Sequence, residues 1–141
     1  MCRNGRFVER GIKEHHGYGS TRFRIEPRFA VRIDSKLGGL GVLLEPTSVV
    51  AKAWEQAERI GARGQFRPRL ALVTGAGPVG LLAALLARQR GLETHVVDLV
   101  TEGAKPRLVA DIGAQYHAEP VRDLQAEPDI VIECKGVGKV S

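Results

Sequence analysis

Residues 70–98, LALVTGAGPVGLLAALLARQRGLETHVVD, decide the fold. The apolar run 70–74 is typical of a strand that is covered on both faces, and residues 94–97 are expected to form the next strand. Between them, Leu and Ala recur at helical spacing over 81–90, and Gly91 ends that helix. The order of strand, glycine turn, helix and strand predicts a βαβ unit of the kind that binds dinucleotides.

Three glycines occupy the turn of this unit in G-x-G-x-x-G spacing. Gly75 permits the tight turn, Gly77 allows the backbone to approach a pyrophosphate, and Gly80 allows the helix to pack closely on the sheet. Pro78 suits the first helical turn, where a missing N–H costs nothing. Asp98 follows the second strand, where a carboxylate can accept hydrogen bonds from a ribose diol. A strand, turn and helix that bind no ligand are the alternative interpretation.

The sequence pattern divides the chain into two parts. Its 141 residues are about the length of one domain, yet segments 1–65 and 66–141 differ so much that they look like parts of two domains. In the second part we expect a further helix over 105–112, a short strand at 116–117, an apolar strand over 129–134 and a glycine turn at 136–138. This part therefore predicts a partial Rossmann domain, an incomplete doubly wound parallel sheet of the α/β class.

The first part is predicted to be rich in β-structure and to end in a helix. After a loop over 5–20, FRIEPRFAVRI at 23–33 alternates apolar and charged residues, which predicts strands over 23–26 and 29–33 on either side of Pro27. A turn region follows over 34–41. Pro46 suits a first helical turn, and Thr47 and Ser48 can cap nearby amides, so we expect a bridging helix from Glu45. Its expected apolar face is Val49, Val50, Ala53, Trp54, Ala57 and Ile60.

Composition limits the classes of partner. The net charge of +5 is concentrated in residues 1–33, where arginines interleave with aromatic residues as they do on nucleic-acid surfaces. Solvated strand faces explain the same alternation, so we expect no nucleic-acid partner and keep a basic interaction protein as an alternative. The sequence contains no apolar run of about 18 residues, so we expect no membrane span. Cys2 and Cys134 do not form a disulfide framework, which favours a cytoplasmic protein.

Four motifs occur in an order and spacing that resemble one known family. They are MCRNGRFVERGI at 1–12, HHGYGS at 15–20, LLEPTSVVAKAWEQ at 43–56 and VTGAGPVGLLAALLARQRGLETHVVDLVTEGAKPRLVADIGAQYH at 73–117. Over nearly its whole length the chain resembles the glucose (aldose) 1-dehydrogenases of the zinc-containing, medium-chain alcohol dehydrogenase superfamily. The resemblance implies that residues 1–65 are the end of a GroES-like catalytic domain plus the bridging helix. Residues 66–141 would then be an incomplete NAD(P)-binding Rossmann domain.

The resemblance also implies roles for individual positions. Glu9 matches a residue that hydrogen-bonds the sugar, and Glu45 matches a position that approaches the catalytic zinc or the sugar. Cys2 matches the last of four cysteines that hold a structural zinc, and here it would be a vestige. His15 and His16 follow that cysteine and are not the zinc-binding His and Glu of the family, so we interpret them as surface residues. The implied cofactor-binding residues are Gly75, Gly77, Pro78, Val79, Gly80, Leu81, Asp98, Leu99 and Val100.

The choice of cofactor can be predicted from charge. Asp98 favours a free 2′-hydroxyl, and Leu99 and Val100 supply no cation, so we expect NAD in preference to NADP. Lys105 and Arg107 are close enough in sequence to weaken that preference.

The resemblance implies that an intact, homo-oligomeric member oxidises an aldose at C1 to the lactone, with zinc polarising the hydroxyl and a nicotinamide accepting the hydride. A catalytic zinc requires three protein ligands, and only Glu45 matches one. We therefore expect a fragment that retains the dinucleotide site and is inactive alone. A stand-alone nucleotide-binding module is the second alternative.

Overall fold

The structure is a computed structural model that describes residues 4–125 and 127–135. The chain divides into two compact units, residues 1–38 and residues 39–141. The bridging helix, which the sequence assigns to the first part, packs within the second unit.

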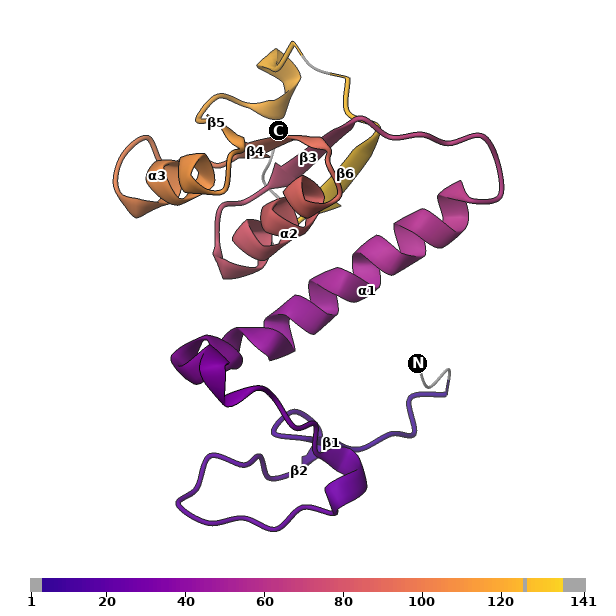
Figure 1. Ribbon diagram of the computed structural model, residues 1–141, viewed down its shortest axis with the longest axis vertical. Helices are drawn as coiled ribbons and strands as arrows, with labels where there is room; N and C mark the ends of the chain where they lie inside the picture. Colours follow the sequence, from indigo (N-terminus) through magenta and orange to yellow (C-terminus); the bar gives the residue numbers. More distant parts are fainter. Residues whose placement is uncertain (1–3, 126, 136–141) are drawn as a thin grey trace. The chain divides into compact units, whose positions relative to one another are not determined.

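Four parallel strands form the sheet of the second unit. They are β3 (Leu70–Thr74), β4 (Glu93–Val97), β5 (Gln115–His117) and β6 (Ile130–Glu133), and they lie in the order β5-β4-β3-β6 (Figure 1). Leu72 of the central strand β3 is in register with His95 on one side and Val131 on the other. Because the chain leaves β3 toward β4 and then returns to its other side, a topological switch point lies between β3 and β6. The prediction of an incomplete doubly wound sheet is confirmed.

Helices α2 (Pro78–Gln89) and α3 (Ala104–Asp111) follow β3 and β4. Ala83, Ala84 and Ala87 of α2 are fully buried and belong to the hydrophobic core that also includes Val73 and Val96 of the sheet. Such small side chains let the helix approach the strands closely. The predicted helix over 105–112 and strand at 116–117 are both present, shifted by about one residue at their ends.

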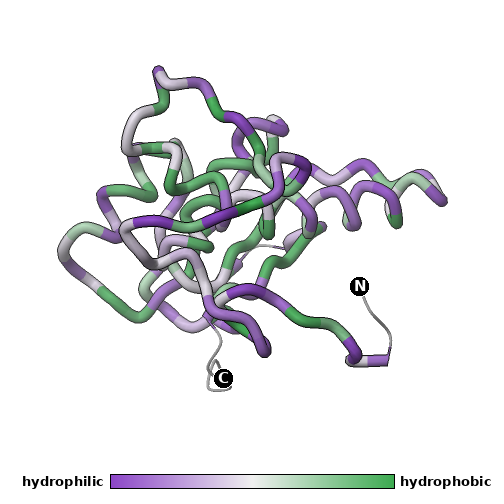
Figure 2. The backbone as a smooth tube through the Cα atoms, turned by 90° about the horizontal axis from the view of Figure 1, so that it is seen from below, coloured by the Kyte–Doolittle hydropathy of each residue, from purple (hydrophilic) through white to green (hydrophobic). Residues whose placement is uncertain are grey.

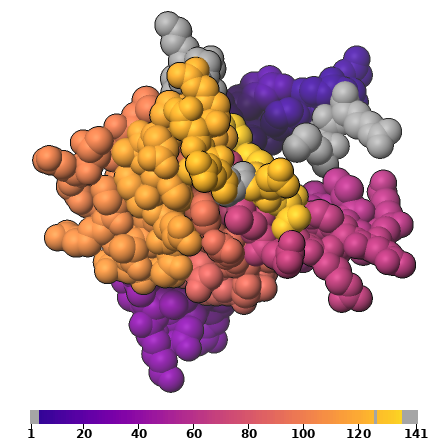
Figure 3. All heavy atoms as spheres, turned by 90° about the horizontal axis from the view of Figure 1, so that it is seen from above, coloured from indigo at the N-terminus to yellow at the C-terminus, as the bar shows by residue number. Residues whose placement is uncertain are grey.

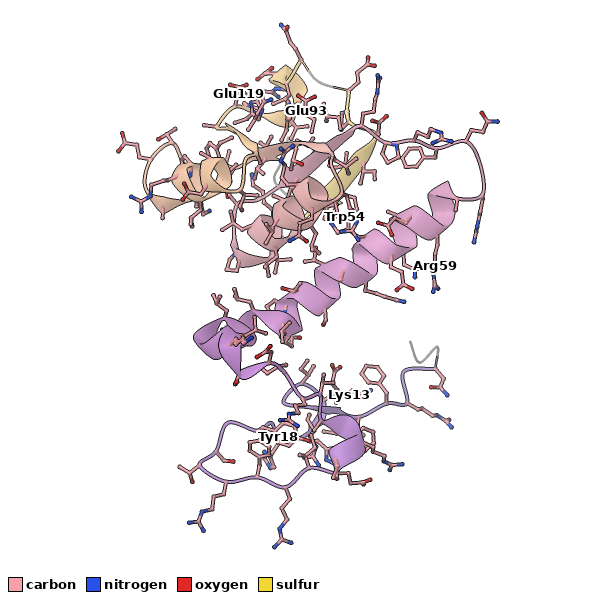
Figure 4. All side chains as sticks on the ribbon, in the orientation of Figure 1. Lys13, Tyr18, Trp54, Arg59, Glu93 and Glu119 are labelled. Carbon is pink, nitrogen blue, oxygen red and sulfur yellow. The ribbon has the colours of Figure 1, made fainter. Side chains whose placement is uncertain are left out.

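Helix α1 (Leu44–Gly61) packs on α2 (Figure 1). Hydrophilic and hydrophobic residues alternate along it (Figure 2), and Trp54 points toward α2 while Arg59 lies on the far side (Figure 4). Only Val50 and Trp54 of the predicted apolar face are buried, whereas Val49 is 59% exposed. The Arg90 guanidinium lies 5.0 Å from the Trp54 ring centroid and its Nε donates to Glu58 at 2.6 Å, which ties α2 to α1.

The predicted capping of α1 by Thr47 and Ser48 is wrong. The Thr47 hydroxyl donates to the Leu43 carbonyl at 2.6 Å, and the Ser48 hydroxyl donates to the Glu45 carbonyl at 2.7 Å. Both residues lie inside the helix, where hydroxyls bond back to carbonyls of the preceding turn. The helix starts after 3-10 turns over Ser35–Leu43, which are interrupted at Gly38.

The chain between β5 and β6 covers the sheet face opposite α2. This segment includes a 3-10 helix, Val121–Asp123, and forms much of the yellow-orange surface in Figure 3. Alternation along β4 turns His95 to this side while Val96 packs in the core on the other. The His95 and His117 rings are stacked, and together with Asp123 they line a cavity of about 350 Å³.

The first unit contains little regular structure. β1 (Glu9–Arg10) and β2 (Glu14–His15) form a two-residue ladder inside the segment predicted to be a loop. The strands predicted over 23–26 and 29–33 are wrong, because a 3-10 helix, Pro27–Phe29, interrupts them and no described strand pairs with either segment. No residue from 4 to 38 is buried, so the alternating apolar side chains have no core to pack on. The GroES-like origin of this unit stays a prediction.

Candidate functional site

The glycine turn between β3 and α2 is held against the end of β4. The Gly75 N–H donates to the Val97 carbonyl at 2.7 Å, and the Ala76 N–H donates to Asp98 Oδ2 at 2.7 Å. Gly75 has a φ of 93°, in the region that favours glycine. A Cβ at Gly75 would also lie 3.2 Å from the Cys134 carbonyl carbon, so both geometry and space require glycine here.

Gly80 is tightly packed, whereas Gly77 borders free space. A Cβ at Gly80 would lie 1.7 Å from the Gly75 carbonyl oxygen, so the first turn of α2 touches the backbone of the glycine turn. A Cβ at Gly77 would meet no atom within 4 Å. Gly77 is the N-cap of α2 and provides no side-chain cap, and Pro78 occupies the first turn as predicted. The partly positive N-terminus of the helix therefore opens onto free space beside Gly77, which is the arrangement that suits an anion.

Asp98 is a buried carboxylate at the end of β4, only 6% exposed. Its Oδ2 accepts hydrogen bonds from the Ala76 N–H and from the Lys105 ammonium at 2.8 Å, and its Oδ1 accepts from the Leu99 N–H at 2.7 Å. Burial alone would raise the pKa of Asp98, but these hydrogen bonds and the charge of Lys105 more than offset burial and lower the pKa to about 2 from 3.8. Asp98 is therefore ionised at neutral pH, and its charge is balanced by Lys105.

The carboxyl ends of β3 and β6 meet beside the same turn. The Thr74 hydroxyl donates to Glu133 Oε2, and the Lys135 N–H donates to Glu133 Oε1 at 2.6 Å. The hydrogen bond from Thr74 is the main cause that lowers the pKa of Glu133. Burial raises the pKa of the Cys134 thiol, and the charge of Glu133 raises it further. The side chains at this edge are thus a neutral thiol, a bonded carboxylate and the lysine.

The structure brings together all of the residues predicted to bind the cofactor. The turn residues Gly75 to Leu81 and the segment Asp98 to Val100 lie at one edge of the sheet, joined by the bond between Ala76 and Asp98. Sequence reasoning missed the Ala76 amide, Glu133 and Lys135. Their position in the chain is the signal that could have found them. Each ends or follows a parallel strand, and the carboxyl ends of parallel strands meet at one edge of the sheet.

The residues predicted to contact sugar or zinc are divided between the two units. Glu9 is exposed and lines a cavity of about 810 Å³ in the first unit, with Arg10 and Tyr18 among its neighbours. Glu45 is exposed in the first turn of α1 in the second unit. His15 and His16 are exposed, and Cys2 and the predicted turn at 136–138 lie outside the described residues.

The described part of the chain does not fit a zinc site. No group of three or more His, Cys, Asp or Glu side chains that could hold a metal ion occurs within residues 4–125 and 127–135. Glu45 therefore has no partner ligands there.

Comparison with known proteins identifies the family. The family described as "Glucose dehydrogenase C-terminus" matches residues 38–141. The chain belongs to this family.

Several glucose dehydrogenases are similar to almost the whole chain. Glucose 1-dehydrogenase from Methanocella arvoryzae is 38% identical over all of this chain, and glucose 1-dehydrogenase 2 from Vulcanisaeta moutnovskia is 38% identical over 99% of it. The crystal structure of glucose dehydrogenase from Haloferax mediterranei superposes on 97% of the chain with a TM-score of 0.88 and 28% identity. The same enzyme in complex with NADP, Zn and gluconolactone gives a TM-score of 0.87.

The chain spans 41% of the length of these relatives. No helix in the described part of this glucose dehydrogenase relative is long and apolar enough to cross a membrane.

Replacing Gly80 with alanine should lower the stability of the second unit much more than replacing Gly77 with alanine. Gly80→Ala should destabilise the second unit by about 3 kcal/mol, because its Cβ would force α2 away from Gly75. Gly77→Ala should change stability by less than about 1 kcal/mol, because its Cβ enters free space in a backbone conformation that alanine adopts readily. Urea unfolding of both variants measures the difference. Equal destabilisation by the two substitutions would contradict the close approach.

Asp98 should make the protein less stable in acid. Because its pKa is lower in the folded chain than in the unfolded chain, its contribution is present above pH about 3.8 and is lost as pH falls through about 2. The contribution is about 2 kcal/mol. We expect the stability difference between the natural chain and Asp98→Asn, measured in urea, to shrink as pH falls from 5 to 2. A difference that does not depend on pH would show that Asp98 is not the responsible group.

Proposed function

We propose that this chain is the cofactor-binding part of a glucose dehydrogenase and that it binds a nicotinamide dinucleotide at residues 75–81. The observation that carries the proposal is the free space beside Gly77 at the uncapped N-terminus of α2. The pyrophosphate would lie on the N–H groups of Val79 and Gly80. The Haloferax mediterranei enzyme, whose structure resembles this chain, is known in complex with NADP, which supports a nicotinamide dinucleotide as the ligand.

The adenosine ribose would lie against the segment Asp98 to Val100. Asp98 Oδ1 accepts a short hydrogen bond from Leu99 and a long one of 3.4 Å from Val100, which leaves it capacity for a ribose hydroxyl. Lys105 balances the charge of Asp98 with its own side chain 38% exposed. A balanced carboxylate repels a 2′-phosphate less than a free one, so we propose that the chain accepts both NAD and NADP.

The complete enzyme would oxidise glucose at C1 to the lactone, and the bound nicotinamide would accept the hydride. Glu9 would hydrogen-bond the sugar, since Glu9 is among the residues that line the large cavity of the first unit. The first unit would be the end of a GroES-like catalytic domain. The described residues do not fit zinc, so we assign them no step that depends on the metal. We propose that the isolated chain binds the cofactor without oxidising sugar. A cytoplasmic location and a homo-oligomeric complete enzyme belong to the same proposal.

Calorimetric titration of the full chain with NAD and NADP tests the proposal. We expect both to bind, and we expect Gly77→Ala to weaken binding about tenfold with little change in stability, because its Cβ would occupy the space of the pyrophosphate. A mixture with glucose should show no nicotinamide reduction at 340 nm. Folded protein that releases no heat with either dinucleotide would overturn the proposed site, and rapid glucose oxidation would overturn the inactivity of the chain.

Lys105 should set the balance between the two cofactors. Lys105→Met removes the cation beside Asp98 and leaves that carboxylate unbalanced, so we expect its affinity for NADP to fall about fivefold more than its affinity for NAD. Arg107→Met is the matched control, because it removes the same charge from an exposed position on the same helix. Equal losses for NAD and NADP in Lys105→Met would refute the role of Lys105.

A further inference from the structure

Lys135 lies two residues beyond the end of β6, next to the glycine turn. Its Cγ is 3.1 Å from the position that a Cβ on Gly75 would take. β6 pairs with β3 through Thr74 and Glu133, so residue 135 is carried to the switch point between these strands. The side chain therefore leaves the sheet at the edge where the turn and the N-terminus of α2 are found.

The ammonium of Lys135 is buried and has no hydrogen-bond partner among the described residues. The carboxylate of Glu133 has a pKa that is lowered mainly by the hydrogen bond from Thr74 and to a smaller extent by the charge of Lys135. Both Glu133 oxygens already accept other hydrogen bonds, from the Thr74 hydroxyl and from the Lys135 backbone N–H. No ion pair within 4.0 Å joins the two side chains in this part of the structure.

A buried ammonium without a partner is unfavourable, because its lost hydration is not replaced. Natural proteins keep such a group where a ligand supplies the missing charge. An anion bound on the N-terminus of α2, against the same turn, would supply it. The lysine after β6 and the N-terminus of α2 would then form one anion site.

We propose that Lys135 is a phosphate-binding residue and that its ammonium donates hydrogen bonds to the pyrophosphate of the dinucleotide. This inference rests on the proposed function, which supplies the dinucleotide as the ligand. The chemistry that the site recognises is a diphosphate, whether free or esterified to nucleosides, and the ribose contacts at Asp98 distinguish the two.

The test compares Lys135→Met with Lys135→Arg in the full chain, and Lys52→Met serves as the control because it removes the same charge from an exposed position on α1. We expect Lys135→Met to bind NADP, NAD and inorganic pyrophosphate at least tenfold more weakly than the natural chain. Lys135→Arg should stay within about threefold, and Lys52→Met should not differ. The unliganded Lys135→Met protein should be as stable as the natural chain or more stable, because an unpartnered ammonium is removed, whereas loss of a structural lysine would lower its melting temperature.

The outcomes separate this inference from the proposed function. If the natural chain binds dinucleotides and Lys135→Met binds them equally well, Lys135 has no role and the proposed function stands. If the natural chain binds pyrophosphate through Lys135 but no dinucleotide, the anion site stands and the proposed function fails. Unchanged pyrophosphate binding in Lys135→Met, or no pyrophosphate binding by the natural chain, overturns the inference.

Discussion

The second unit depends on the contact between the first turn of α2 and the carbonyl oxygen of Gly75. Only a residue without a Cβ at position 80 permits this approach, since a Cβ there would lie 1.7 Å from that oxygen. The contact sets where α2 starts relative to β3, and therefore which side chains of α2 enter the core. The buried alanines of α2 and the packing of α1 on its outer side follow from that placement.

The same contact leaves the helix terminus available for chemistry. Hydrogen bonds from Gly75 and Ala76 to the end of β4 join the glycine turn to Asp98. Asp98 has a double role in this arrangement. One oxygen accepts from the turn at Ala76 and the other accepts from Leu99, and we propose that this second oxygen also accepts from a ribose hydroxyl.

The βαβ unit could be predicted because its determinants are local. Buried parallel strands read as continuous apolar runs, and the glycine spacing is contained in six residues. The strands expected over 23–33 failed for the opposite reason, because alternation shows only that a segment could pair, and no described strand provides the partner. The same limit applies to Lys135, whose approach to Gly75 depends on strand order. Thr47 and Ser48 do not cap the helix because it starts at Leu44, before both of them.

The chain matches 41% of its relatives' length, and residues 38–141 match the glucose dehydrogenase C-terminal family. Backbone amide NMR shifts recorded during titration with NADP test the central claim most directly, because they report on each N–H of the turn separately. The account predicts the largest shifts at Gly77, Val79 and Gly80, with smaller ones at Leu99 and Val100. Shifts confined to residues 4–38, with the amides of the glycine turn unchanged, would contradict it.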